Sequence, residues 1–215
     1  MALMPRISAV DRRAQLLDAA WRVLLADGVA GATTRAICAE AGMPQGAFHY
    51  CFSSRDELLT EVAAVMLPRE LSAATQAIGR AGTLVDTVHL ALLAYWELVE
   101  AEPRVHQVIY EITALALRDP ALSAPTRERY AGYPTAVAAV LERIAEVRGI
   151  VWDRPVAVLA AQIVAVLDGL TLQYLVGRDA GTARAALLAC AQDVAARARR
   201  ARRVAVMPVL AGADR

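Results

Sequence analysis

Two very short helical segments on either side of a glycine constrain this 215-residue chain more than any other feature. Thr33 and Thr34 can cap a helix that stops at Gly42, because glycine accepts the left-handed backbone that ends many helices. Another helix starts near Pro44 and ends at about Cys51. Helices this short are marginal alone, so the pair must pack against a longer helix.

A longer helix is predicted directly before the pair. Ser8 is placed as its N-cap, Asp11 follows three residues later, and the helix ends at Asp27 and Gly28. Its apolar stripe comprises Leu17, Trp21, Leu24 and Leu25. Three helices in this order, with a tight turn before the last, have the layout of a helix-turn-helix unit.

The rest of the chain predicts a helical bundle, so the fold class is all-α. Ala accounts for 47 residues, and no alternating β-branched run is long enough for a sheet. Ser53 or Ser54 can cap a long fourth helix that reaches residues 79–82 and is kinked at Pro68. Further breaks fall at Pro103, at Pro120 with Pro125, at residues 149–155 and at residues 177–181. We therefore expect about nine helices, with a head at residues 1–54 and a bundle at residues 55–215.

Net charge argues at first against a nucleic-acid ligand. The 23 basic residues, all Arg, are balanced by 22 acidic residues, and residues 1–60 alone hold six of each. Proteins that bind nucleic acid usually carry clustered positive charge that displaces counterions from phosphate. DNA binding by this head would thus depend on a few well-placed Arg side chains, including Arg6, Arg12 and Arg13.

The outward positions of the third short helix suit a DNA groove. Gln45, Gly46, His49 and Tyr50 carry hydrogen-bonding groups without adding charge. Gln can pair with adenine edges, Gly allows close backbone approach to phosphate, and His and Tyr can donate to base or phosphate.

Three consecutive stretches resemble the tetracycline-repressor (TetR) family of transcriptional regulators. They are DGVAGATTRAICAEAG (27–42), MPQGAFHYCF (43–52) and SSRDEL (53–58), and the resemblance covers residues 11 to 62. Pro44 stands where the family usually has a capping Ser or Thr. The resemblance implies a regulator, most simply a repressor, that binds a pseudo-palindromic double-stranded DNA operator as a homodimer.

The resemblance also implies which positions meet DNA. The start of the second helix would meet phosphate, the third helix would face base edges and sugar, and a basic residue opening the fourth helix would reach phosphate. The residues at these positions are Thr33, Thr34, Arg35, Gln45, Gly46, His49, Tyr50, Cys51 and Arg55.

The bundle would then supply a dimer interface and a pocket for a small, largely apolar effector. Helices near 155–177 and 182–203 are expected to pair with their symmetry mates. The interface residues expected there are Leu159, Ile163, Val166, Leu167 and Leu170. The effector contacts expected, chosen as polar-tipped or aromatic residues in apolar helices, are Trp96, Tyr110, Thr113, Tyr133 and Gln162.

Other functions are disfavoured. The apolar segment 156–176 is long enough to span a membrane, but Gln162, Asp168 and Gln173 make a buried bundle helix the better interpretation. Three cysteines without a paired motif suggest a reducing cytoplasm, and we expect no metal and no cofactor. The Arg-rich segment 197–203 resembles a solvated face at a helix C-terminus. Usual catalytic motifs are missing, although an all-α protein-interaction module or a helical enzyme without a recognisable motif stays open.

Overall fold

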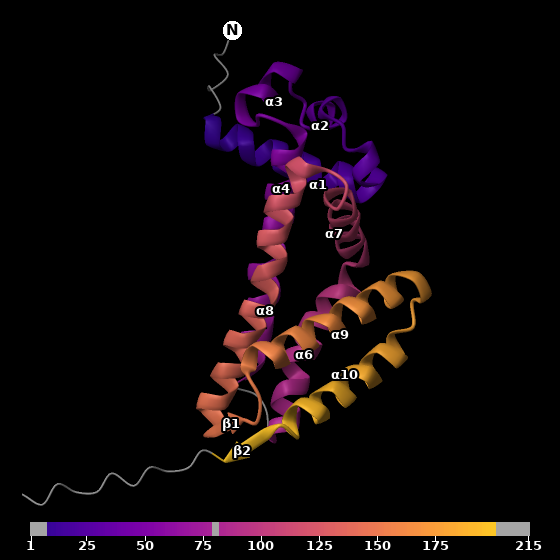
Figure 1. Cartoon of the computed structure of the whole chain (residues 1–215). Helices are drawn as coiled ribbons and strands as arrows, with labels where there is room; N and C mark the ends of the chain where they lie inside the picture. Colours follow the sequence, from indigo (N-terminus) through magenta and orange to yellow (C-terminus); the bar gives the residue numbers. More distant parts are fainter. Residues whose placement is uncertain (1–7, 79–81, 201–215) are drawn as a thin grey trace, which may run out of the picture.

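A computed structural model describes residues 8–78 and 82–200, and within them the chain is almost entirely helical (Figure 1). The helix-turn-helix unit lies at one end, and the longer helices extend from it. The elements are α1 (Ala9–Gly31), α2 (Thr34–Glu40), α3 (Gln45–Cys51), α4 (Arg55–Ala64), α5 (Met66–Ala77), α6 (Leu84–Ala101), α7 (Pro103–Ala116), α8 (Pro120–Arg148), β1 (Ile150–Trp152), α9 (Val156–Gly177), α10 (Ala180–Ala195) and β2 (Ala198–Arg200).

The head consists of α1, α2 and α3, and its caps follow the sequence pattern. The Ser8 side chain accepts from the Asp11 N–H, and the Thr33 hydroxyl accepts from the Ala36 N–H at 3.1 Å. Thr33 is therefore the N-cap of α2, and Thr34 is its first helical residue. Pro44 begins α3 without a side-chain cap, as its missing hydroxyl predicted.

Proline acts on the helices in two different ways. The expected long fourth helix is divided at Val65 into α4 and α5, and Pro68 lies in the first turn of α5. A proline there cannot donate to the carbonyl four residues earlier, which explains the break. This division gives ten α-helical segments in the described chain where about nine were expected. The break expected at Pro125 is wrong, because Pro125 and Pro134 both lie inside the 29-residue α8.

A small antiparallel ribbon, absent from the sequence prediction, closes the far end of the bundle. In it Val151 of β1 pairs with Arg199 of β2, and Asp153 forms an ion pair with Arg199 at 3.1 Å. The helix expected over 182–203 thus ends at Ala195, and Arg199 and Arg200 lie on a strand rather than on a helix C-terminus. Arg202, Arg203 and Arg6 lie outside the described residues.

Two hydrophobic clusters form the core. The first joins α1, α2 and α3 to α4, α7 and the start of α8, with Phe48, Leu58 and Ile112 among its buried members. The second joins α6, α8, α9 and α10 around Trp96 and Leu187. Packing is therefore continuous from the head into α4 and α7. The domain boundary at residues 54/55 stays a prediction.

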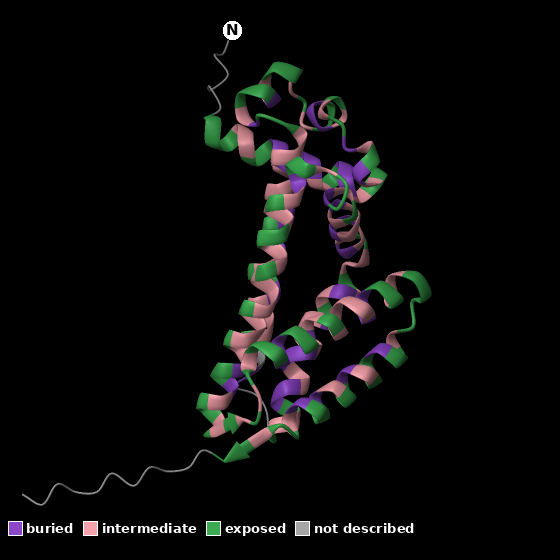
Figure 2. Ribbon diagram, in the orientation of Figure 1, coloured by how far each residue is buried: buried purple, intermediate pink, exposed green. Residues whose placement is uncertain are grey.

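One described helix, α9, is long and apolar enough to cross a membrane by length and composition alone. In the fold it packs between α8 and α10, and Figure 2 shows alternating buried and exposed positions along it. Val158, Leu172 and Val176 are its large exposed apolar residues.

Candidate functional site

The outer face of α3 carries exposed side chains that lie outside the hydrophobic core. Gln45, Gly46, His49 and Tyr50 are all exposed, and Tyr50 is 70% exposed. Phe48, on the opposite face, is fully buried and holds α3 against α1. The helix therefore presents a polar, uncharged row at the tip of the molecule, where it can enter a groove (Figure 1).

The arginines near this row differ in exposure and in the contacts that they already make. Arg35 is exposed on the first turn of α2, and no ion pair joins it to another described residue. Arg12 lies beside the row, with its guanidinium carbon 5.6 Å from the Tyr50 ring centre. Arg13, in contrast, turns inward to Glu57 and Glu61, so it is not positioned to follow a DNA backbone.

Arg55 does not extend toward the expected phosphate surface. Its Nε donates to the Ala32 carbonyl at 2.7 Å, and its Nη2 donates to the Val29 carbonyl. The Val29 carbonyl also accepts the Ala32 N–H at 3.3 Å, and the guanidinium adds charged donors to both carbonyls at the end of α1. The expectation that Arg55 contacts phosphate is therefore corrected: in this structure the side chain fastens the end of α1 to α4. Cys51 and Thr34 are both half-buried.

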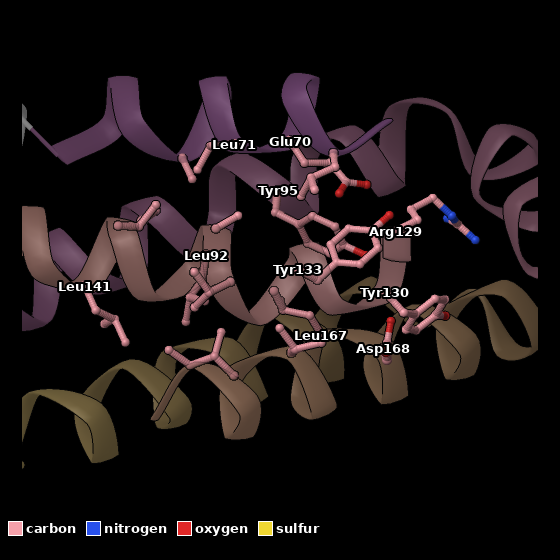
Figure 3. A pocket seen from close by; sticks show the side chains of 18 of the residues that line it. Glu70, Leu71, Leu92, Tyr95, Arg129, Tyr130, Tyr133, Leu141, Leu167 and Asp168 are labelled. Atoms are coloured by element: carbon pink, nitrogen blue, oxygen red, sulfur yellow. The ribbon is translucent and has the colours of Figure 1, made fainter. Parts of the chain in front are cut away.

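A cavity of about 110 Å³ lies between α5, α6, α7, α8 and α9 (Figure 3). This volume approaches the roughly 150 Å³ of a cavity that holds a benzene-sized molecule. Most of its wall is aliphatic, with Leu71, Leu92 and Leu141 gathered toward one end. Such a wall with a few polar groups is typical of a small-molecule site.

The polar groups of the cavity gather at the other end. Those labelled in Figure 3 are Glu70, Tyr95, Arg129, Tyr130, Tyr133 and Asp168. Two more wall residues lie next to this group: the His106 ring centre is 5.9 Å from that of Tyr95, and the Tyr110 hydroxyl donates to the Asp168 carbonyl. Together they come from five helices. Burial raises the pKa of Glu70 to about 7 and also raises the pKa of Asp168. Burial lowers the pKa of His106 to about 4, so this imidazole is neutral at physiological pH.

Only part of the expected effector set lines this cavity. Tyr110 and Tyr133 do, whereas Thr113 is not on its wall and accepts from Arg129 Nη2 at 2.8 Å. Trp96 is fully buried away from it, with its Nε1 donating to Glu100 at 2.6 Å, and Gln162 is exposed on another face of α9. Those three expectations are corrected because helical rotation places these side chains on other faces.

Several lining residues were missed. Glu70, Tyr95, Arg129 and Asp168 were not predicted, although a charge inside an apolar helix such as α9 was a usable signal for Asp168.

The expected dimer contacts are also only partly available at the surface. Leu159, Ile163 and Leu170 are buried within the protomer core, so they cannot form an interface with a second copy. Val166 and Leu167 are half-buried, and Leu167 lines the cavity. The face of α9 that was expected at the dimer interface is thus turned inward, because its most apolar residues pack in the core of the monomer.

Among the residues that the structure describes, no group of three His, Cys, Asp or Glu side chains could hold a metal ion.

Comparisons with known proteins agree for the head and for most of the bundle. Residues 16–62 match the family model "Bacterial regulatory proteins, tetR family", and residues 85–199 match "BetI-type transcriptional repressor, C-terminal". The nicotine-responsive transcriptional repressor HdnoR of Paenarthrobacter nicotinovorans is 30% identical over 79% of this chain and 86% of its own.

Solved structures show the same fold. A transcriptional regulator from Pseudomonas aeruginosa PAO1 aligns with a TM-score of 0.70 at 22% identity, covering 89% of this chain and 93% of its own. The multidrug-binding protein EbrR, solved with imidazole, aligns with a TM-score of 0.63 at 28% identity, covering 83% of this chain and 94% of its own. The matched names describe transcriptional regulators rather than enzymes. With a helix-turn-helix head, a helical bundle and both family models matched, the chain belongs to the TetR family of bacterial transcriptional regulators.

Proposed function

We propose that this regulator is a cytoplasmic repressor that binds a pseudo-palindromic operator as a homodimer and is released by a small molecule. The observation that carries the DNA-binding step is the exposed row on α3, because Gln45, His49 and Tyr50 all lie at the surface and none of them belongs to the buried core. Gln45 and His49 would read base edges, and Tyr50 would lie against sugar and phosphate. Arg35 and the N-terminus of α2 would meet the backbone.

A homodimer would present two such rows to the same face of DNA. The exposed apolar residues Val158, Leu172 and Val176 on α9, with Leu188 on α10, support a second copy as the partner of this face. A two-fold contact there would set the recognition helices about 34 to 36 Å apart, or a multiple of that spacing.

Ligand response would pass through α7, which touches both the cavity and the head. His106, Ile109 and Tyr110 line the cavity. On the same helix, Arg104 Nη2 donates to the Leu25 carbonyl of α1 at 2.8 Å. A ligand that repositions α7 would thereby shift the head, with a coupling of about 1 to 3 kcal/mol.

A mobility-shift assay tests this function. The full chain is titrated onto the DNA upstream of its own gene and onto a scrambled fragment of equal length. We expect a sequence-dependent shift that is lost with Gln45→Ala and His49→Ala together. Equal shifts of the two fragments at moderate salt would contradict the proposal.

A further inference from the structure

One carboxylate on the wall of the ligand cavity, that of Glu70, is attracted by Arg129 and Arg69 but bonded to neither. Glu70 on α5 is only 8% exposed, and no hydrogen bond or ion pair reaches it from the other described residues. A buried carboxylate that lacks hydrogen bonds is costly to the fold. Its position on the cavity wall means that a ligand could supply the missing partner.

The nearest guanidinium in the cavity does not satisfy this carboxylate. Arg129 donates from Nη2 to the Thr113 hydroxyl at 2.8 Å, and its guanidinium carbon lies 5.3 Å from the Tyr130 ring centre. Figure 3 shows its guanidinium extending away from the Glu70 carboxylate. The Nη1 atom of Arg129 is buried without a partner among the described residues, so an anionic ligand is the competing possibility that the experiment must exclude.

Charge and aromatic rings both favour a cation. The cavity wall holds two carboxyl groups, Glu70 and Asp168, against one guanidinium, and His106 is neutral. Burial raises the pKa of both carboxyl groups, and a bound cation would favour their ionised forms. Tyr95 and Tyr133 are both close enough to Glu70 for its charge to raise the pKa of their hydroxyls, and Figure 3 shows all three side chains at the same end of the cavity. Aromatic faces attract ammonium groups, and the attraction strengthens when the cation is removed from water.

The two ends of the cavity differ in chemistry, which sets the shape of the ligand. Leu71 and Leu141 lie at one end, and Glu70, Tyr95 and Tyr133 lie at the other (Figure 3). Resting on the proposed function of this pocket, we propose that its ligand is a small amphipathic organic cation whose ammonium group binds Glu70 between the rings of Tyr95 and Tyr133. The apolar body of the ligand lies along the leucine end.

Calorimetric titration of the full chain, without DNA, tests this with three compounds of nearly equal shape. These are phenylbutylammonium, the neutral phenylbutanol and the anionic phenylbutyrate. We expect the cation to bind at least about tenfold more tightly than the alcohol, because only the cation forms a charge-assisted hydrogen bond with Glu70. Tightest binding of phenylbutyrate, equal binding of cation and alcohol, or no binding of the cation at millimolar concentration overturns the proposal.

Substitution of the carboxylate gives the matched test. Glu70→Gln keeps the shape of the side chain, and near-ultraviolet circular dichroism checks that it folds. We expect its affinity for phenylbutylammonium to fall to within about threefold of the affinity for phenylbutanol, which itself stays unchanged. The control is Glu128→Gln, which removes an exposed carboxylate from α8 and leaves all three affinities as in the wild type. Wild-type affinity of Glu70→Gln for the cation overturns the proposal.

The design separates this inference from the proposed function. If the cation binds through Glu70 and operator DNA is still held equally well, the ligand class stands and the release mechanism fails. If the protein binds and releases DNA with an uncharged ligand only, the regulatory function stands and the cation proposal is overturned.

Discussion

The backbone N–H of Val29 donates to Glu111 Oε2 at 2.8 Å, a contact between residues 82 positions apart in the chain. Gly28 makes this approach possible: its φ is 70°, and a Cβ built there would lie 2.9 Å from the same oxygen. The neighbouring residue on α7, Tyr110, donates from its hydroxyl to the Asp168 carbonyl at 3.0 Å. Two adjacent residues of α7 therefore make different contacts: Glu111 bonds to α1 in the head, and Tyr110 bonds to α9 at the ligand cavity.

Replacing Glu111 should weaken the communication between ligand and DNA. Glu111→Ala leaves the Val29 N–H without its partner, which should lower the free energy of unfolding by about 1 to 3 kcal/mol. We expect ligand affinity without DNA to stay unchanged while the ligand-induced loss of DNA affinity shrinks. Urea unfolding and fluorescence anisotropy measure these two effects. Glu111→Gln keeps an acceptor oxygen and serves as the control, and a full ligand response in Glu111→Ala would disprove the role of this contact.

The two kinds of DNA contact should separate on substitution. Gln45→Ala should cost about 1 to 3 kcal/mol on the preferred operator and relax the choice of particular base pairs. Arg35→Ala should weaken binding to all sequences alike. It should also reduce the slope of log K against log salt concentration by about 1.8, because the homodimer loses one phosphate contact, worth about 0.9, from each protomer. Binding to a set of operators, each with one base pair changed, at several salt concentrations distinguishes them. The opposite pattern would exchange the two assignments.

Arg55 should matter for the stability of the head rather than for phosphate binding. Arg55→Ala removes donors from the Ala32 and Val29 carbonyls, which should lower the free energy of unfolding by about 1.5 to 3 kcal/mol. Arg35→Ala, at an exposed site, should change it by less than about 0.5 kcal/mol. Thermal unfolding of both variants provides the comparison. If Arg55→Ala is as stable as the wild type, the structural role of this residue is contradicted and a phosphate contact becomes the better assignment.

Local signals in the sequence predicted the head well. Capping residues such as Ser8 and Thr33 and the turn at Gly42 act within a few residues, so the sequence carries them directly. The same reasoning predicted the outward row on α3 from the burial of its opposite face. Arg55 was expected at the phosphate surface, and its contacts within the protein were not predicted, because its partners are backbone carbonyls at the end of another helix, which no spacing rule reveals.

The bundle was harder to predict because tertiary packing decides which face of each helix is buried. An apolar helix such as α9 offers several apolar rows, and the sequence does not tell which one meets α8 and which one stays outside. Ile163 was expected at the dimer interface, yet it is 3% exposed and packs in the protomer core. Glu70 was missed because its burial depends on α6, α8 and α9, which are distant in sequence.

Glu70 should make the stability of the protein depend on pH above the ordinary range of a carboxyl group. Its pKa rises from 4.5 to about 7 on folding because of burial, so the folded state binds more protons between these values and loses stability as pH increases through that interval. Arg129, Asp168 and Arg69 also act on this group. Glu70→Gln should therefore be more stable than the wild type at about pH 8, by at most about 3 kcal/mol.

The pH dependence is measured by urea unfolding of both proteins across this interval. His106, whose pKa falls to about 4 on folding, opposes Glu70 below pH 6.5, but it is present in both proteins and cancels from their difference. The difference should grow as pH rises and level off above about pH 8. A difference that stays constant with pH would show that Glu70 is ionised throughout in the folded state.

The exposed face of α9 should hold the homodimer together. The double variant Val158→Asp, Leu172→Asp places two charges on this face. In a two-fold interface both protomers contribute the same face, so four charges would be buried against an apolar surface that cannot solvate them. We expect a monomer by light scattering and operator binding weakened at least about 100-fold, because the two half-sites are no longer linked. The control is Leu117→Asp, at an exposed leucine that ends α7, which should remain dimeric. A dimer that survives the double substitution places the interface on another surface.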